Sequence, residues 1–326
     1  MKKKLLALSL SALMMLSLTA CGGAPADDNA NEGDTAYQVG ICQLAPHPAL
    51  DAATQGFIDT LEAELPGVEI DLQNAAGDSP TCTTIVNGFV SNGVDLIMAN
   101  ATPALQAAAT GTSDIPVLGT AVTEYGVALG LKDFDGLVGT NVSGTADLAP
   151  LDKQADMLVK WCPDAKTVGL LYCSAEPNSQ YQVDVMQQNL EAKGLTCTQY
   201  AFSDTNDLSA VTRTAADNSD AIYVPTDNTV ANNTGVIDNI CRPAGVPVIA
   251  GEEGICSGCG VATLSISYYD LGVATGKMAV KILTGEANVA EMPIEYAGNV
   301  TPKYNEAICA DLGLEPLEGY EAIATE

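Results

Sequence analysis

Apolar and polar positions follow two alternating spacings along most of the chain. Short runs rich in β-branched residues predict strands, and stretches with apolar residues three or four positions apart predict helices between them. The predicted helix 50–65 shows the second spacing in its apolar residues: Phe57, Ile58, Leu61 and Leu65. Regular alternation of such strands and helices is typical of parallel sheets covered by helices on both faces.

Two successive sets of these elements are predicted. The first set has strands at 38–41, 68–72, 95–98 and 117–118, with helices at 50–65, 81–92 and 103–109. The second set has strands at 167–172, 196–202, 221–224 and 246–250, with helices at 149–161, 180–193, 208–217 and 229–241. The pattern restarts near 144–150, and the segments 271–283 and 292–297 are expected to cross between the halves again.

The fold class that follows is α/β, with two doubly wound, Rossmann-like lobes joined by a multi-crossover hinge. Lobe 1 is expected to comprise 37–147 with part of 266–290, and lobe 2 to comprise 148–265 with part of 291–326. Each lobe is long enough to bury its own core, because 47% of the residues are hydrophobic.

The first 36 residues lack this pattern. Lys2, Lys3 and Lys4 precede an uncharged apolar run at 5–18, which is too short to span a bilayer and predicts an export signal over 1–20. The signal ends in Leu-Thr-Ala-Cys, which resembles a bacterial lipobox with Cys21 as the lipidated residue. A plain secretory signal is the alternative. The small and polar segment 21–36 is expected to be a flexible tether.

The charge balance restricts the partners. The chain has 13 basic and 41 acidic residues and a net charge of -28, which excludes nucleic-acid binding. It also disfavours strongly anionic ligands, whereas neutral, zwitterionic and cationic solutes experience no such repulsion. Alternatively, the acidity serves solubility alone.

Ligands of doubly wound lobes bind at the carboxyl ends of the strands, so polar groups in the loops there are candidate ligand contacts. The first such loop contains His47, the only histidine, between two prolines. It is a candidate wall of the cleft or, alternatively, a helix-entry residue bonded to backbone. Thr102 is expected to cap the helix that begins with Pro103 and so to direct free backbone N–H groups into the cleft, unless it serves as a cap alone. A single histidine supplies no multi-histidine zinc site, and neither a metal nor a cofactor is expected.

Two loops of the second half carry similar chemistry. One contains Ser174, Glu176, Asn178 and Ser179, and the other contains Asp227 and Asn228. A carboxylate in either loop is suited to an ammonium group, and the amides and hydroxyls are suited to polar oxygens. Ordinary helix capping is the alternative for each loop. Both arginines fall on predicted helices, so a ligand carboxylate would be held by helix N-termini and hydroxyls.

Five motifs occur in order along the chain: HPxLD from His47, ATPAxQ from Ala101, SxExNS from Ser174, VPxDNT from Val224 and DLGVATG from Asp270. Together they resemble the solute-binding lipoproteins of ABC importers, in the tryptophan/tyrosine-binding group. The resemblance covers nearly all of the chain after the tether.

The resemblance implies a type I periplasmic-binding-protein fold with three crossovers and no catalysis. It also implies that a small zwitterionic solute, an aromatic amino acid or a related molecule, binds between the lobes and is delivered to an ABC permease, with the protein held at the outer side of the membrane through Cys21. The positions that match cleft motifs are His47, Thr102, Ser174, Glu176, Asn178, Ser179, Asp227 and Asn228. Asp227 is expected to hold the amine.

The chain departs from the family pattern after the last strand of lobe 2. It has Glu252 and Glu253 there, followed by the pair Cys256 and Cys259, which leaves the ligand identity open. Aromatic residues are scarce, and the tyrosines favoured for stacking on a ligand ring are Tyr125, Tyr268 and Tyr269.

Two alternative functions remain. The chain has ten cysteines, of which nine remain if Cys21 is lipidated, and the pair Cys256 and Cys259 is the favoured disulfide or metal contact. An extracytoplasmic thiol-redox protein would use this pair. A sensor that passes the ligand-bound state to a membrane receptor would need the same two lobes, since both uses depend on tighter ligand binding to the closed form.

Overall fold

The computed structural model describes residues 37–298 and 300–324. Within these residues, the strands form two sheets, one of six strands and one of seven, and confirm the α/β class and the two doubly wound units. The predicted export signal 1–20, the lipidation site Cys21 and the tether 21–36 lie outside the described residues. None of the helices in the described part of the chain is both long enough and apolar enough to cross a membrane.

The first sheet has the strand order β11-β5-β4-β3-β1-β2, and all its neighbouring strands are parallel. Its strands are β1 Gln38–Gln43, β2 Glu69–Asn74, β3 Leu96–Asn100, β4 Val117–Val122, β5 Val142–Ala146 and β11 Glu295–Tyr296. The helices packed with it are α1 Pro48–Glu64, α2 Ser79–Asn92, α3 Thr102–Gly111, α4 Tyr125–Leu129 and α11 Tyr268–Leu283, with the 3₁₀ turn η1 Val289–Glu291.

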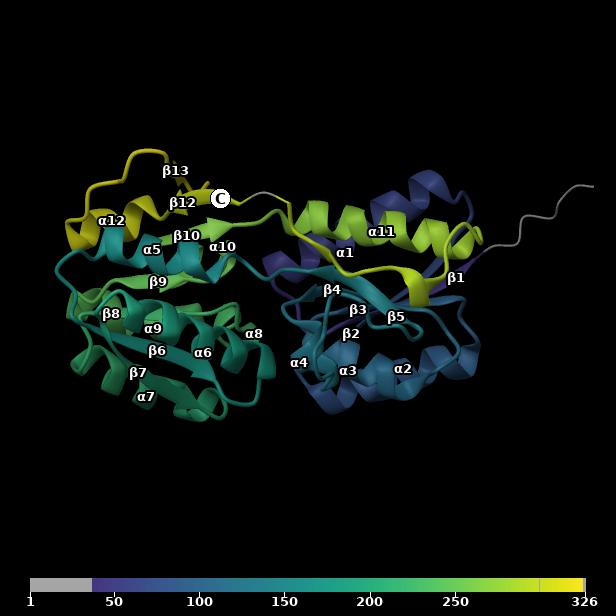
Figure 1. Cartoon of the computed structure of the whole chain (residues 1–326), viewed down its shortest axis with the longest axis horizontal. Helices are drawn as coiled ribbons and strands as arrows, with labels where there is room; N and C mark the ends of the chain where they lie inside the picture. The colour runs from purple at the N-terminus through teal and green to yellow at the C-terminus, as the bar shows by residue number, and fades with distance from the viewer. Residues whose placement is uncertain (1–36, 299, 325–326) are drawn as a thin grey trace, which may run out of the picture. The chain divides into compact units, whose positions relative to one another are not determined.

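Alternating side chains of these strands pack into two hydrophobic cores, one on each face of the sheet. Val39 and Ile41 of β1 point to the face covered by α1 and α11, whereas Cys42 points to the face covered by α2 and α3 (Figure 1). Leu96 and Ile97 divide in the same way on β3. Because successive side chains of a strand point to opposite faces, apolar strands like these require helices on both sides.

The second sheet has the order β13-β12-β10-β9-β8-β6-β7, and only β12 pairs antiparallel with its neighbour β10 among the described strands. Its strands are β6 Thr167–Cys173, β7 Thr196–Phe202, β8 Ala221–Val224, β9 Val248–Ala250, β10 Ala262–Ser265, β12 Thr301–Tyr304 and β13 Glu321–Ala322. The helices packed with it are α5 Leu151–Trp161, α6 Pro177–Ala192, α7 Thr205–Asp217, α8 Asn228–Ala231, α9 Thr234–Ala244, α10 Glu253–Cys259 and α12 Glu306–Leu312.

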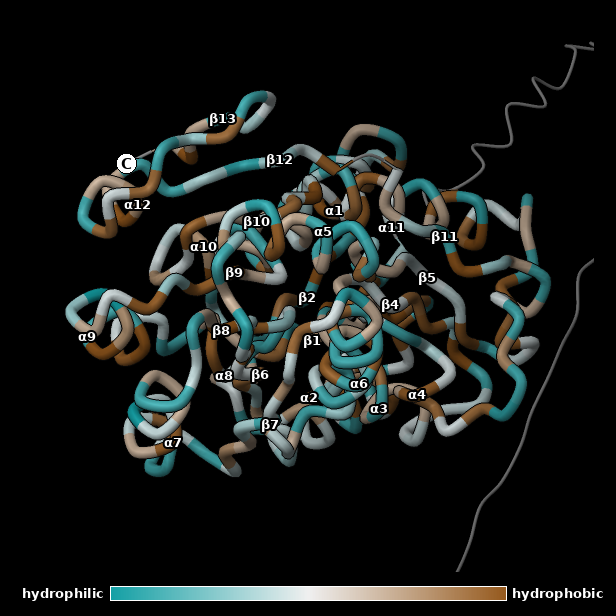
Figure 2. Tube along the Cα trace, turned by 60° about the vertical axis from the view of Figure 1, so that its left-hand side comes forward, coloured by the Kyte–Doolittle hydropathy of each residue, from teal (hydrophilic) through white to brown (hydrophobic). Residues whose placement is uncertain are grey.

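This sheet also separates two cores. One core combines α5, α6 and α12 with Leu170 and Tyr223 of the strands. The other combines α7, α9 and α10 with Leu171 and Ile222, the strand residues that point the opposite way. In Figure 2 the trace of α6 is mostly hydrophilic.

The described chain passes between the sheets after β5, after β10 and after β11. The segment 271–283, which we expected to cross between the halves, instead forms most of α11 and packs along α1. The two helices approach closely because glycines face the contact: a Cβ on Gly272 would overlap the carbonyl oxygen of Ala53, and one on Gly56 would overlap that of Tyr269. The motif that begins at Asp270 therefore serves helix packing.

The single helix predicted over 229–241 is wrong, because the structure has α8 and α9 there instead. Between them lie Asn232 and Asn233, whose side-chain amides donate to the carbonyl oxygens of Asn228 and Thr229, at 3.1 and 2.8 Å. Asparagine side chains compete in this way with regular helix bonding. As a result α8 is a separate four-residue helix whose start lies at the carboxyl end of β8.

Candidate functional site

A narrow cavity with about 10 Å³ of free volume, room for about one water molecule, lies between the carboxyl ends of the two sheets. We call it the inter-sheet cavity. His47, Leu50, Ala121 and Thr123 line it from the first sheet, and Asp147 and Tyr268 line it from two of the connecting passes. The second sheet contributes the remaining lining residues: Asn178, Thr226, Asp227, Asn228, Ala231 and Glu252. Four of the predicted site residues, His47, Asn178, Asp227 and Asn228, therefore meet at one place.

His47 occupies the N-cap position of α1, with extended backbone at φ -158° and Pro48 as the next residue. It is thus the helix-entry residue of the stated alternative, but its side chain makes no capping hydrogen bond to the backbone. Burial lowers the pKa of its imidazole, so the ring is neutral at pH 7. The ring Nε2 is buried without a hydrogen-bond partner in the described chain and is therefore available to a ligand.

Asp227 is buried at the start of α8, and backbone groups occupy both of its carboxylate oxygens. Oδ1 accepts from the N–H of Val230 at 2.9 Å, and Oδ2 accepts from the N–H of Cys173 at 2.7 Å. Burial and the neighbouring charge of Glu176 raise the pKa of Asp227 to about 8. The carboxyl group thus ties α8 to the end of β6 while one face of it borders the cavity.

Glu176 does not line the inter-sheet cavity. Its Oε2 accepts from the backbone and side-chain nitrogens of Asn228, at 3.0 and 2.8 Å, and its Oε1 accepts from the backbone N–H and hydroxyl of Thr229, at 2.8 and 2.7 Å. Four donors from the start of α8 therefore converge on one carboxylate at the N-cap of α6. Glu176 positions the α8 loop, in which Asn228 borders the cavity.

Asn178 and Ser179 follow Glu176 on the first turn of α6, and both are buried. The amide nitrogen of Asn178 donates to the carbonyl oxygen of Thr226 at 3.2 Å, whereas its Oδ1 is buried without a partner in the described chain. The nearby hydroxyl of Ser179 lowers the pKa of Asp227. Asn178 therefore presents an unpartnered acceptor to the cavity, and Ser179 is a polar neighbour of the Asp227 carboxyl group.

Thr102 and Ser174 do not line the inter-sheet cavity. The expectation that Thr102 caps α3 is wrong, because the N-cap is Ala101 and Thr102 is already the first helical residue. Ala101 has a φ of 86°, so the chain turns one residue earlier than the Thr-Pro pattern predicts. Ser174 is exposed, and its hydroxyl donates to the carbonyl oxygen of Phe202 at 3.1 Å.

Ala101 and Ala121 both have positive φ, at 86° and 51°. These values lie in a region that costs about 1–2 kcal/mol for residues other than glycine, and such strain concentrates at binding sites. Ala121 lines the inter-sheet cavity, and β4 is irregular between Gly119 and Val122. The strained end of β4 thus forms part of the cavity wall.

Two carboxylates of the cavity were not among the predicted site residues. Asp147 follows β5, a strand that the sequence pattern does not predict, so the pattern did not mark the loop after it as the end of a strand. Glu252 was noticed only as a departure from the family pattern. It caps α10 by accepting from the N–H groups of Ile255 and Gly254, and burial raises its pKa to about 7.

The inter-sheet cavity is acidic. It is lined by three carboxyl groups and by neither lysine nor arginine among the described residues. Three buried side-chain atoms without partners in the described chain belong to lining residues, namely His47 Nε2, Asp147 Oδ1 and Asn178 Oδ1. Because a buried polar atom without a partner costs about 1–3 kcal/mol, their concentration here favours a polar ligand that carries a positive group.

Of the three tyrosines considered for stacking, only Tyr268 lines the inter-sheet cavity. Tyr125 is buried in the core of the first sheet, and its hydroxyl donates to the carbonyl oxygen of Thr145 at 3.1 Å. Tyr269 is 42% exposed and donates to Asp59 at 2.8 Å. The aromatic contribution of the described residues to the cavity therefore comes from Tyr268 and the imidazole of His47.

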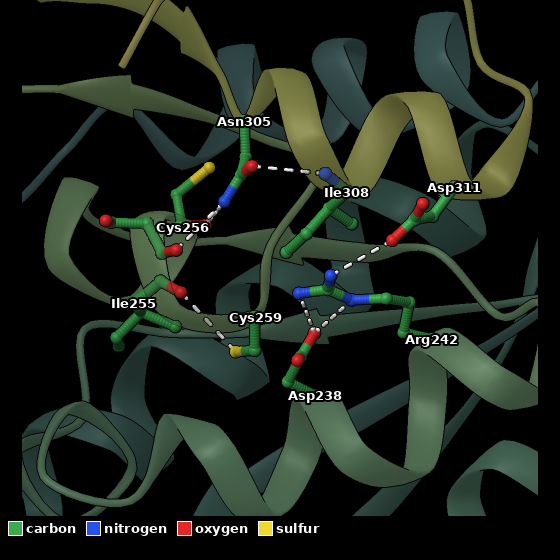
Figure 3. A network of polar contacts seen from close by, with 9 residues as sticks. Asp238, Arg242, Ile255, Cys256, Cys259, Asn305, Ile308 and Asp311 are labelled. Atoms are coloured by element: carbon green, nitrogen blue, oxygen red, sulfur yellow. Dashed lines mark hydrogen bonds and ion pairs between the residues drawn. The ribbon is translucent and has the colours of Figure 1, made fainter. Parts of the chain in front are cut away.

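Cys256 and Cys259 do not form the disulfide that we considered for them, because both thiols are free. They lie on α10, where Cys259 donates to the carbonyl oxygen of Ile255 at 3.4 Å and Asn305 donates to that of Cys256 at 3.2 Å (Figure 3). Burial raises the pKa of both thiols well above the ordinary value, which makes them poor nucleophiles. No cluster suited to a metal occurs in the ranges that the structure describes. These observations argue against the thiol-redox alternative.

Comparison with known proteins places these features in one family. The family model described as ABC transporter substrate binding protein matches residues 38–325. A tyrosine-binding protein of Clostridioides difficile strain R20291 is 33% identical over 325 residues, which cover 97% of this chain and 94% of the relative.

Two solved structures are also similar. An ABC domain from Streptococcus pneumoniae in complex with L-Trp has a TM-score of 0.84 and 32% identity, covering 89% of this chain and 100% of that one. The ligand-free, open structure of a substrate-binding protein with adhesive properties from Clostridium difficile has a TM-score of 0.69 and 38% identity, with the same coverage. The present structure thus superposes better on the complex than on the open protein, although the open protein is closer in sequence.

Proposed function

Because the chain belongs to the family of ABC transporter substrate-binding proteins, whose members bind solutes and are not enzymes, we propose that it captures an aromatic amino acid outside the cytoplasmic membrane. The inter-sheet cavity is the proposed binding site. Delivery to an ABC permease completes the proposed function. The tyrosine-binding relative and the complex with L-Trp support this ligand class.

One observation carries the proposal. The inter-sheet cavity combines three carboxyl groups, an unpartnered imidazole nitrogen and an unpartnered amide oxygen with the ring of Tyr268. An aromatic amino acid supplies an ammonium group for the carboxylates, a carboxylate for neutral donors and a ring for the tyrosine. A sugar would supply no positive charge, and a strongly anionic solute would be repelled.

The proposed mechanism is hinge closure. Lobe 1, 37–147 with part of 266–290, and lobe 2, 148–265 with part of 291–326, would separate to admit the ligand. Since the lining residues come from both sheets, a ligand makes its full set of contacts only when the lobes are together. Ligand binding would therefore shift the population toward the closed form.

The proposed location follows from the amino-terminal segment. Cleavage after residue 20 would leave Cys21 as the lipidated first residue, and 21–36 would connect the lipid to the folded body. One acyl chain alone anchors weakly, whereas the two or more chains of a lipoprotein hold it stably. Mass spectrometry of the protein extracted from membranes would detect the lipid on Cys21, and a water-soluble product without it would contradict the anchoring.

A thermal-shift screen of the secreted chain, with Cys21→Ala, tests the ligand class. Aromatic amino acids, other amino acids, nucleosides and simple sugars are each added in excess. A ligand at about 100 times its Kd stabilises the folded state by about 2.7 kcal/mol. We expect a shift with L-tyrosine or L-tryptophan, and a shift confined to another class would overturn the proposed ligand.

A further inference from the structure

Asp147 has a free acceptor that faces the inter-sheet cavity. The residue is only 2% exposed. Its Oδ2 accepts a hydrogen bond from the hydroxyl of Tyr268 at 2.9 Å, whereas its Oδ1 has no partner among the described residues. Both Asp147 and Tyr268 line the cavity. A buried carboxylate with one unengaged oxygen beside a cavity is suited to a positively charged ligand group.

The other two carboxyl groups of the cavity differ from Asp147. Both oxygens of Asp227 accept from backbone N–H groups, those of Cys173 and Val230. Both oxygens of Glu252 are occupied in the same way, by backbone N–H groups at the start of α10. Asp147 is therefore the one carboxylate of the described cavity wall with an oxygen that no hydrogen bond within 3.5 Å satisfies, although the nearby Thr123 hydroxyl lowers its pKa.

Asp147 also lies where two of the connecting passes meet. It directly follows β5, and its backbone N–H donates to the carbonyl oxygen of Val122 at 3.3 Å, which fixes it to the first sheet. Tyr268 begins α11 directly after the second pass. The hydrogen bond between the two side chains therefore links the passes after β5 and after β10.

We propose that Asp147, and not Asp227, accepts the ammonium group of the ligand, and that this contact transmits binding to the passes between the sheets. The inference rests on the proposed function and names the residue that selects for an amine. Asn178 Oδ1 offers a second unpartnered acceptor from the opposite side of the cavity. Asp227 then serves to hold α8 against β6.

The test is the discrimination between ligands with and without an amine. The probes are L-tryptophan and L-tyrosine, with indole-3-propanoate and 3-(4-hydroxyphenyl)propanoate as the matched compounds that lack the amine. Isothermal titration calorimetry on the secreted chain, with Cys21→Ala, measures each Kd for the parent, for Asp147→Asn and for Asp227→Asn. Asparagine keeps the shape of the side chain, removes its charge and replaces one acceptor oxygen by an NH2 donor.

For Asp147→Asn we expect the amino acids to lose at least ~30-fold in affinity and the amine-free compounds to lose much less, so that the preference for the amine disappears. This variant should fold, because burial raises the pKa of Asp147 and the neutral amide avoids that desolvation cost. Its thermal unfolding is recorded in parallel. If it does not fold, Asp147→Ser, which leaves room for water, takes its place.

Retention of the parental preference by Asp147→Asn would overturn the inference, and loss of that preference in Asp227→Asn alone would assign the amine to Asp227. Tyr268→Phe removes the donor to Oδ2 and leaves the charge, so it should keep a preference for the amine. Failure of the parent protein to bind either amino acid would instead refute the proposed function, and the two failures are therefore distinct.

Discussion

Replacing Glu176 by alanine tests whether this residue supports the site or contacts the ligand. Its carboxylate is 6% exposed and accepts four hydrogen bonds from Asn228 and Thr229. The helix that these donors begin, α8, is only four residues long, and its other side-chain anchor at the N-terminus is Asp227. Glu176→Ala removes every acceptor at once, and we expect the second unit of the protein to lose stability.

The magnitude follows from the four contacts. A hydrogen bond to a charged group contributes about 1.5–3 kcal/mol, but the four share one carboxylate and are not additive. Asn228 and Thr229 are only half-buried, so water can replace part of the lost bonding. We therefore expect a loss of about 2–4 kcal/mol in the free energy of unfolding, or roughly 4–12 °C in Tm.

Urea and thermal unfolding followed by circular dichroism measure this loss. Glu315→Ala is the matched control, because Glu315 is exposed and its removal should change the free energy of unfolding by less than about 0.5 kcal/mol. Glu176→Gln keeps one acceptor oxygen and should fall between the two. If Glu176→Ala has the same urea midpoint as the parent but no longer binds the ligand, the supporting role is refuted and Glu176 is a ligand contact.

Three further predictions follow. The pKa of Asp227 is raised to about 8 and that of Glu252 to about 7, whereas both are near 4 in the unfolded chain. Between pH 4 and these raised values the folded state therefore binds more protons than the unfolded state, and its stability falls as the pH rises. The unliganded protein should therefore lose about 2–3 kcal/mol of stability from pH 6.5 to 8.5 in urea titrations, and a double variant with Asn and Gln at these positions should show a flatter profile. Gly272→Ala should destabilise by more than about 2 kcal/mol because its Cβ meets α1, whereas Gly88→Ala, on α2 with open space around it, should be neutral or stabilising in the same thermal assay. Replacing both cysteines of α10 by alanine should leave the Kd for the amino acid within about twofold, and a large loss would revive the thiol-redox alternative.

Elements with clear apolar patterns were predicted well from the sequence. The strands 196–202 and 221–224 coincide with β7 and β8, and the helix 50–65 nearly coincides with α1. The strand β5 was missed, because Val142–Ala146 contains serine, glycine and threonine and has little apolar character of its own. Its side chains are buried by contacts with α11 and β4, which local sequence does not record.

Half of the predicted site residues line the inter-sheet cavity. His47, Asn178, Asp227 and Asn228 reach the cavity because each follows a strand whose end lies at the same edge of its sheet. Glu176 misses the cavity because four donors of the neighbouring loop already hold its carboxylate. Such competition for an acceptor depends on which loops are adjacent in space, and a motif read along the chain does not contain that information.

Both units are completed by segments from the end of the chain, which would determine when the chain can fold in the proposed export. The first sheet receives its edge strand β11 from 295–296, and its helix α11 comes from beyond 267. The second sheet receives β12 and β13 from beyond 300. In the proposed export, neither core would be complete until nearly the whole chain had left the translocation channel. A chain that cannot complete either unit early would stay unfolded enough to be secreted, and any truncation that removes the last 32 residues would damage both units at once.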